Sequence, residues 1–297
     1  MIWGSTYLAI RVAVESLPPL ASAGARFTLA GLVLAAAVAI RRGPSALLVP
    51  RPQLLGTALV GICLLLLGNG LVMVGERDVP SALAALIIGS VPLWIVLYRR
   101  VADERIEGTV LAGVLMGFLG VGVLVVPRGI SGEVAPIGLL FVVLAAAFWA
   151  WGTFMSKRMA LPRDAFVGTA LQQLLGGVAC LAAAALVGER VDPNTWSSRS
   201  LYALAYLVVF GSLLGFSAYT WLLVHVPVSM VSTYAYVNPV VAVLLGALIL
   251  AEPITSSIIF GAMLIVTAVA FIVRTQAPPA PEAIAVDDER PPVGSAS

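Results

Sequence analysis

The sequence predicts an all-α integral membrane protein with ten transmembrane helices, arranged as two inverted five-helix repeats. Of its 297 residues, 60% are apolar and only 11% are charged, and the mean hydropathy is +1.03. Soluble domains are about half apolar and about a quarter charged, so this composition excludes an ordinary soluble domain. The other two observations are a series of ten apolar runs and an internal repeat that relates the first five runs to the last five.

The apolar runs follow one another with short polar connections. The first run, 2–17, has sixteen residues, whereas a membrane span requires about twenty. We therefore expect about eight further apolar residues before Met1. The other runs cover residues 20–40, 53–75, 81–98, 108–126, 135–154, 165–187, 201–224, 229–250 and 256–273.

The internal repeat is recognised from matching residues at a nearly constant spacing. Pro92 recurs as Pro239 after 147 residues, and Glu104 recurs as Glu252 after 148. The same spacing relates Val79-Pro80 to Val226-Pro227, Gly113 to Gly261, and Trp3-Gly4 to Trp151-Gly152. Two copies of a five-helix unit in one membrane must lie antiparallel, because five is odd. We predict a first repeat at 1–127, a second at 134–274, and a disordered, Pro-rich cytoplasmic tail at 275–297.

The basic residues predict that both termini are cytoplasmic, because loops with many arginines stay inside. With the N-terminus inside, the inner connections and the tail contain Arg41, Arg42, Arg51, Arg99, Arg100, Arg105, Lys157, Arg158, Arg163 and Arg274. The outer connections contain Arg77, Arg128, Arg190 and Arg199.

Pro239 lies in the middle of the ninth run and predicts a cavity at this depth. A proline there removes a backbone donor and leaves the carbonyl of Ala235 without its usual partner. Lipid cannot satisfy such a carbonyl, so the backbone must face protein or a water-filled space. Pro92 is eleven residues into its run and Asn238 nine residues into its own, so both reach the middle of the bilayer.

Aromatic and polar residues near this depth are candidates for the cavity wall. Tyr234, Tyr236 and Asn238 either line the cavity or only satisfy the freed carbonyls. Trp3 and Trp151 occupy matching repeat positions and are either paired walls of the cavity or anchors at the membrane interface.

Arg26 lies six residues into the second run, and a charge inside a membrane span indicates function unless it reaches the interface. Asn69 lies at a similar depth and either caps Arg26 or contacts substrate. Arg11 and Glu15 are four residues apart in the first run, and we expect them to pair with each other.

Four short motifs occur in order along the chain. They are Trp3-Gly4-Ser5-Thr6-Tyr7, Pro18-Pro19 followed by Arg26-Phe27, Gly68-Asn69-Gly70, and Tyr234-Ala-Tyr-Val-Asn-Pro239 with Gly246 and Glu252. Over residues 1–273 this order resembles the EamA branch of the drug/metabolite transporter superfamily. The resemblance implies ten helices in two EamA repeats and a central cavity lined by helices 1, 3, 4, 6, 8 and 9. It implies that Tyr7 and Pro92 belong to the cavity.

The predicted function is a secondary transporter of a bacterial inner membrane, exporting amino acids or related small metabolites. The expected substrate is neutral or zwitterionic, and the other partners are membrane lipid and a second copy of the chain. The homodimer rests on the small-xxx-small patterns Gly113–Gly117 and Ser257–Gly261, which allow close helix packing. No nucleic acid, cofactor or metal is expected, since Cys63 and Cys180 lie in apolar runs without neighbouring ligands.

Two other functions are weaker alternatives. Asn238-Pro239 is typical of the turns of water channels, but the matching pair is Val91-Pro92, which lacks the second asparagine. A membrane-embedded enzyme would need catalytic groups in the membrane, whereas each aspartate lies in a connection or in the tail. An ATP-driven pump is excluded for this chain, because Lys157 is its only lysine and is not in a phosphate-binding loop.

Overall fold

The structure is a computed structural model that describes residues 2–131, 134–226, 231 and 234–275, with side chains not described at 127–131, 235–236 and 273–274. Within these residues every regular element is a helix. In chain order the elements are α1 (Ile2–Ala13), α2 (Pro19–Arg42), η1 (Pro44–Leu47), α3 (Arg51–Gly61), η2 (Ile62–Gly70), α4 (Leu71–Gly75), α5 (Ser81–Ile88), α6 (Val91–Val101), α7 (Gly108–Ser131), α8 (Pro136–Ser156), α9 (Ala165–Leu186), η3 (Pro193–Thr195), α10 (Ser198–Tyr206), η4 (Leu207–Phe216), α11 (Ser217–His225), α13 (Tyr234–Leu250) and α14 (Ser256–Thr275).

The helix lengths agree with a membrane protein. Seven helices in the described part of the chain are long and apolar enough to cross a bilayer, and three of them are composite, among them Ser81–Val101, which joins α5 and α6. Of the other two composite helices, one joins α3, η2 and α4 into Arg51–Gly75, and one joins α10, η4 and α11 into Ser198–His225. Val237–Leu250 and Ser256–Ile272 are shorter apolar helices, and α1 has 12 residues. The predicted all-helical class is therefore confirmed for the described residues.

The composite helices Arg51–Gly75 and Ser198–His225 each contain a π-helical stretch, η2 in the first and η4 in the second. Such a stretch widens the helix and is frequent at functional sites. Each contains a glycine at a close approach: a Cβ on Gly68 would lie 2.9 Å from the Trp149 ring, and one on Gly211 would lie 2.6 Å from a terminal nitrogen of Arg26. The two widened stretches thus bring backbone close to the side chains of the central cavity.

The two repeat-related prolines behave differently. The fourth run is interrupted at Gly89-Ser90, and Pro92 follows as an early residue of α6, where a missing N–H costs nothing. Helix α13 continues through Pro239, so the lost donor does not end that helix. A Cβ on Gly89 would lie 3.1 Å from the Pro239 ring, which places this proline against the interruption between α5 and α6.

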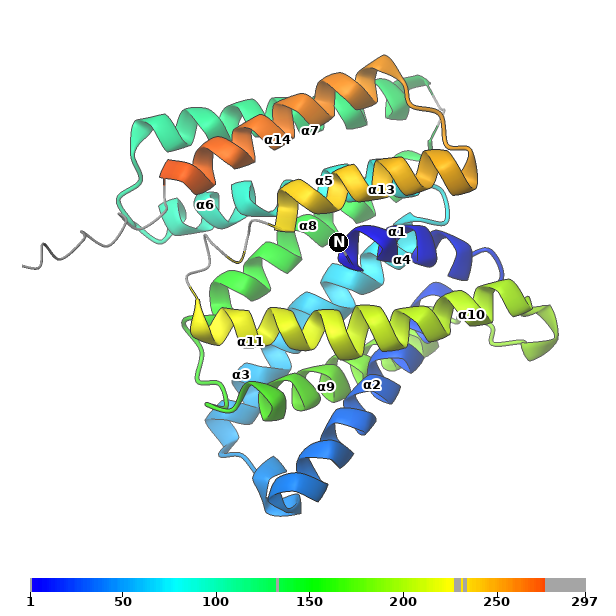
Figure 1. Cartoon of the computed structure of the whole chain (residues 1–297), viewed down its shortest axis with the longest axis vertical. Helices are drawn as coiled ribbons and strands as arrows, with labels where there is room; N and C mark the ends of the chain where they lie inside the picture. The colour runs from blue at the N-terminus through cyan, green and yellow to red at the C-terminus, as the bar shows by residue number, and fades with distance from the viewer. Residues whose placement is uncertain (1, 132–133, 227–230, 232–233, 276–297) are drawn as a thin grey trace, which may run out of the picture.

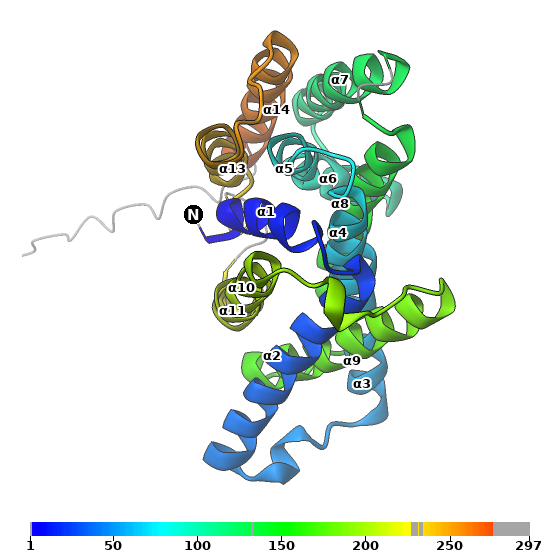
Figure 2. The same cartoon turned by 90° about the vertical axis from the view of Figure 1, so that its right-hand side faces the viewer.

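The long helices pack in pairs across the molecule. Helix α2 crosses α9 at one end of the long axis, and α7 lies beside α14 at the other (Figures 1 and 2). Small residues allow both contacts: a Cβ on Gly177 would lie 2.6 Å from the backbone nitrogen of Thr28, and one on Gly261 would lie 2.6 Å from Leu124. Gly117 likewise meets Ala268, so the small-xxx-small patterns predicted to support a homodimer are used within the chain.

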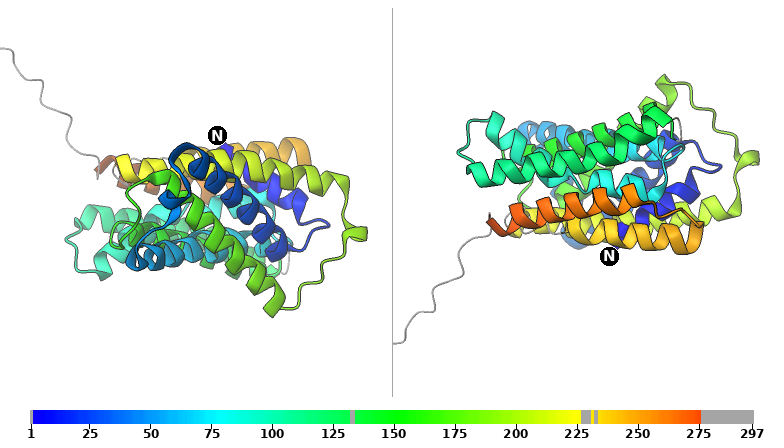
Figure 3. Two further views of the ribbon diagram at one scale, coloured as in Figure 1. Left: turned by 90° about the horizontal axis from the view of Figure 1, so that it is seen from below. Right: turned by 90° about the horizontal axis from the view of Figure 1, so that it is seen from above.

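The connections lie at two opposite ends of the helices, as the views along the long axis show (Figure 3). The first end consists of the connections 14–18, 76–80, 188–197 and 251–255. There the Glu252 carboxylate accepts hydrogen bonds from Ser81 N (2.8 Å), Ser81 Oγ (2.9 Å) and Ala82 N (3.0 Å), at the start of α5. Glu189 similarly accepts bonds from the first backbone N–H groups of α2. These anionic caps join distant segments at the first end.

The second end consists of the connections 43–50, 102–107 and 157–164 together with Val226. Its ion pairs join Arg42 to Asp164, and Glu104 to both Arg99 and Arg158. The Arg99 and Arg158 guanidinium groups lower the pKa of the Glu104 carboxyl.

The prediction that Arg11 and Glu15 pair with each other is wrong. Helix α1 ends at Ala13, so Glu15 is not on the helical face that a spacing of four residues assumes. Arg11 instead donates to the backbone carbonyls of Glu76 and Arg77, and Glu15 lies 3.9 Å from Arg199.

Candidate functional site

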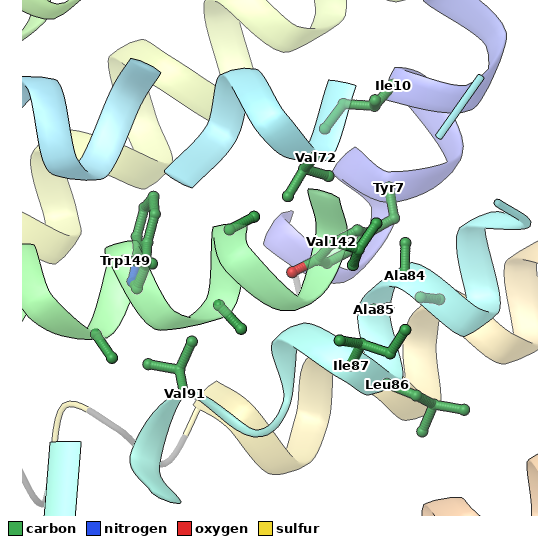
Figure 4. Close-up of a cluster of buried hydrophobic side chains, with 14 of the residues drawn as sticks. Tyr7, Ile10, Val72, Ala84, Ala85, Leu86, Ile87, Val91, Val142 and Trp149 are labelled. Carbon is green, nitrogen blue, oxygen red and sulfur yellow. The ribbon is translucent and has the colours of Figure 1, made fainter. Parts of the chain in front are cut away.

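A cavity lies at the centre of the bundle, where α1, α2, η2, α8 and η4 meet. Its volume is about 50 Å³, which is room for one or two water molecules. Figure 4 shows Tyr7 of α1, Val72 of α4 and Trp149 of α8 in the same buried cluster. The wall combines residues from both halves of the sequence: Trp3, Thr6, Tyr7, Ile10, Arg26, Phe27, Gly68, Asn69, Val72, Ile88, Ala145, Trp149, Gly211, Phe216 and Tyr234.

An aromatic cluster of Trp3, Trp149, Tyr219 and Tyr234 lies on one side of this cavity. The Trp3 ring centroid lies 5.5 Å from that of Trp149, 5.1 Å from Tyr219 and 5.3 Å from Tyr234. The Trp149 Nε1 group donates to the Tyr234 hydroxyl at 3.1 Å, and Trp3 Nε1 donates to the Gly211 carbonyl at 3.2 Å. These bonds hold the indole rings in fixed orientations.

The aromatic cluster separates the cavity from a larger groove of about 720 Å³. Trp3 and Tyr234 line both spaces, and Tyr219 lines the groove. The groove extends toward the second end, where Val226 and Val231 form part of its wall. The four rings therefore form a barrier between the cavity and the groove.

Arg26 brings a positive charge into the cavity wall. Its side chain is only 3% exposed, its Nε donates to Ser212 Oγ at 2.8 Å, and its guanidinium lies 4.8 Å from the centre of the Phe27 ring. The buried Nη1 atom has no hydrogen-bond partner, and no carboxylate of the described residues lies within ion-pair distance of Arg26. A buried charge without a partner is costly, so this guanidinium is suited to receive an anionic group.

Asn69 and Tyr7 complete the polar part of the wall. Asn69 donates from Nδ2 to the Leu64 carbonyl at 3.3 Å within η2, and it does not cap Arg26, whose bond goes to Ser212. Among the hydrogen bonds of the described residues, none joins the side-chain oxygen of Asn69 to this guanidinium. Tyr7 is 8% exposed and lines the cavity from α1. The structure thus brings Trp3, Tyr7, Arg26, Asn69 and Tyr234 together.

Other predicted residues lie elsewhere. Trp151 is 36% exposed on the outside of α8 and lies against Tyr98 and Phe154. It is two positions after Trp149, which lines the cavity, and residues two apart on a helix point in nearly opposite directions. Asn238 is buried and lines the groove rather than the cavity. Pro92 and Pro239 do not line the cavity, and the side chain of Tyr236 lies outside the described residues.

Among the residues of this region that the sequence predictions missed are Trp149, Tyr219, Ser212 and Glu76. The first three contact Trp3 or Arg26 across more than 140 positions of the chain, so no local pattern indicates them. The sequence could have indicated Glu76, because it is an acidic residue at the end of an apolar run. Among the described residues no group of three or more His, Cys, Asp or Glu side chains is arranged to hold a metal.

Comparison with known proteins decides the family. The sequence model of the EamA-like transporter family matches residues 1–126 and again residues 136–274, which together cover nearly all of the described chain. This chain belongs to the EamA-like transporter family. The resemblance inferred from the four motifs is thereby confirmed.

The relatives of this EamA protein carry transporter names. It is 38% identical over 247 residues to the uncharacterized inner membrane transporter YedA of Escherichia coli K12, covering 83% of this chain and 78% of YedA. It is 26% identical over 276 residues to a probable amino-acid metabolite efflux pump of Salmonella typhimurium, covering 89% of each chain. A solved crystal structure shares the fold with a TM-score of 0.66 and 24% identity, covering 92% of this chain and 94% of the other.

Proposed function

We propose that this EamA protein is a secondary transporter that moves a small metabolite across a bacterial inner membrane by alternating access to the central cavity. The observation that carries this proposal is the buried guanidinium of Arg26, which lies without an anionic partner in a cavity built by both halves of the chain. A membrane protein retains such a charge where it binds something.

We further propose that the chain forms ten helices in two inverted repeats, at 1–127 and 134–274. Several features recur at the repeat spacing in support of this architecture. The π-helical stretches η2 and η4 occupy corresponding positions. Asp103 (φ 58°) and Ala251 (φ 53°) are left-handed residues 148 positions apart, and each precedes a repeat-related glutamate. The pairing of α2 with α9 and of α7 with α14 is expected if a twofold axis relates the repeats.

The chemistry of the cavity favours a substrate with a carboxylate. A guanidinium binds a carboxylate through two parallel charge-assisted hydrogen bonds. Around Arg26 the wall is aromatic and aliphatic, with Asn69, Thr6 and Tyr7 as uncharged polar groups. An amino acid, whose carboxylate would bind Arg26 and whose side chain would contact the aromatic rings, fits this combination. The name of the Salmonella relative points to the same class.

The small cavity volume supports an occluded conformation. A solute larger than one or two waters enters only if the aromatic cluster separates, and that separation would join the cavity to the groove. At the first end the bonds of Glu252 to Ser81 and Ala82 keep the 251–255 connection on the start of α5. Opening of one barrier at a time is the essential requirement of alternating access.

Equilibrium binding to the purified protein tests this function. The probes are the twenty amino acids, each compared with its amide, in which the carboxylate is replaced by a neutral group. We expect at least one amino acid to bind and its amide to bind about 10–100-fold more weakly, because a hydrogen bond to a charged group contributes about 1.5–3 kcal/mol. Arg26→Gln should remove this difference, whereas Arg199→Gln, at a residue exposed on α10, should retain it. Equal binding of acid and amide to the wild type would contradict the assignment.

A further inference from the structure

Glu76 is a buried acidic residue that the cavity site does not use. It is the first residue after the span Arg51–Gly75, and its side chain is 0% exposed. Neither of its carboxyl oxygens has a hydrogen-bond partner among the described residues. An isolated carboxylate in such a place is very costly, so the group takes up a proton unless a cation or a donor reaches it.

Arg11 is the described cation whose charge acts on the Glu76 carboxyl, but its hydrogen bonds go to backbone carbonyls. Arg11 Nη1 donates to the backbone carbonyls of Glu76 and Arg77, and the Arg11 guanidinium forms no ion pair with the Glu76 carboxyl. Glu252 adds a second negative charge nearby, fixed by its bonds at the start of α5. Burial first, and then the charge of Glu252, raise the pKa of the Glu76 carboxyl, while Arg11 opposes them.

The other charged groups around Glu76 do not compensate its charge. Tyr7 of α1 interacts with it electrostatically, Arg77 and Asp78 of its own connection are exposed, and α2 contributes Arg26 at the cavity. Helices α5 and α8, which flank the connection, contain no acidic or basic side chain. A protonated carboxyl group is therefore the form that this closed environment accommodates.

The position of Glu76 connects it to both the cavity and the first end. Val72, one helical turn earlier on α4, lines the cavity, and so does Tyr7. On the other side, the 76–80 connection leads directly to Ser81, where Glu252 is bound. Arg77 and Asp78 of this connection already face water, and separation of the 251–255 connection from α5 would let water reach the buried Glu76 carboxyl as well.

We propose that Glu76 is a proton-binding site: its carboxyl group holds a proton while the first end is closed, and it gives that proton to water when this end opens. The product is a carboxylate that pairs with the Arg11 guanidinium, which already lies on the same residue. The inference rests on the proposed transport function for the opening step, whereas the bound proton itself does not depend on a substrate. One proton per opening would couple the movement of substrate to the proton gradient.

Infrared spectroscopy of the full chain in lipid nanodiscs tests for the bound proton without any substrate. At neutral pH the wild type should show the C=O stretch of a protonated carboxyl group, and ¹³C-labelled glutamate should shift this band. The band should be lost in Glu76→Gln and retained in the matched variant Glu189→Gln, because Glu189 binds N–H groups of α2 as a carboxylate. A wild-type spectrum without a labelled protonated-carboxyl band would overturn the proposal, as would an unchanged band in Glu76→Gln.

The pH dependence of thermal stability gives a second measurement, which also serves if Glu76→Gln folds poorly. A carboxyl group with a raised pKa in the folded protein stabilises it at low pH, and this contribution is lost as the pH rises from the unfolded value, about 4.3, through the folded one. As the pH is raised from 5 to 8, the thermal unfolding midpoint of the wild type should fall by ~3 °C or more relative to that of Glu76→Gln or Glu76→Ala. In Glu104→Gln the thermal midpoint should change with pH as it does in the wild type. The pKa of Glu104 is lowered, so this group does not titrate between pH 5 and 8. Parallel curves for the wild type and both Glu76 variants would overturn the proposal.

Absence of transport with the infrared band present would contradict the transporter function and leave the proton site standing.

Discussion

Trp149 and Trp151 are two residues apart on α8 and face different environments. Trp149 is 8% exposed and meets Trp3 at the cavity, whereas Trp151 is 36% exposed and stacks on Phe154. The repeat pairs Trp3 with Trp151, so the sequence alone favoured Trp151 as the second wall. Repeat matching finds equivalent positions in two copies, but it does not find which side chains of the two copies meet. That contact depends on how α1 and α8 are rotated about their axes.

The matched pair Trp149→Phe and Trp151→Phe tests this assignment. Trp149→Phe removes the donor to the Tyr234 hydroxyl and part of the contact with Trp3, interactions that each contribute about 0.5–1.5 kcal/mol. We expect amino-acid binding to weaken several-fold in this variant and to stay unchanged in Trp151→Phe. Binding titrations on both purified variants provide the measurement. A larger effect of Trp151→Phe would place the cavity on the other face of α8.

At the scale of elements, the apolar runs predicted where helices lie, because an apolar run bounded by prolines and charges has few alternatives in a membrane. They did not predict the internal form of those helices. The sequence placed a break at Pro239, yet α13 continues through it, and the interruption in the related run falls at Gly89-Ser90. The π-helical form of η2 and η4 depends on neighbours such as Trp149 and Arg26, which approach their glycines from other helices.

Glycine substitutions test the packing of α2 against α9. A Cβ on Gly177 would lie 2.6 Å from the backbone nitrogen of Thr28, whereas one on Gly122 of α7 would meet nothing within 4 Å. Gly177→Ala should destabilise the protein by about 1–3 kcal/mol, because backbone cannot move aside as a side chain can. Gly122→Ala should be neutral or stabilising by up to about 1 kcal/mol, as for other helical glycines. Thermal midpoints of the two variants relative to the wild type measure the difference; similar midpoints for both would contradict the close contact between α2 and α9.

At the scale of the whole molecule, we infer the orientation in the membrane from where the basic residues gather. Arg42, Arg99, Arg158 and Lys157 lie at the second end, and Arg77 and Arg199 at the first. We expect the second end to be cytoplasmic, because positively charged connections remain inside. A reporter enzyme fused after Thr275 should therefore be active only in its cytoplasmic form. Strong activity of a periplasmic reporter at this position, with a cytoplasmic reporter silent, would contradict the proposed orientation.

The central claim is that substrate crosses the membrane through the cavity that contains Arg26. The most direct measurement is counterflow in proteoliposomes, in which unlabelled amino acid inside drives uptake of the same labelled amino acid from outside. The amino acid is the one that binds best in the comparison of acids with amides. The wild type should accumulate label above equilibrium, and Arg199→Gln should match it. Arg26→Gln should lose at least about 90% of this uptake at equal protein content, because a hydrogen bond to a charged group changes binding by a factor of about ten or more. Equal counterflow by the wild type and Arg26→Gln would contradict the account.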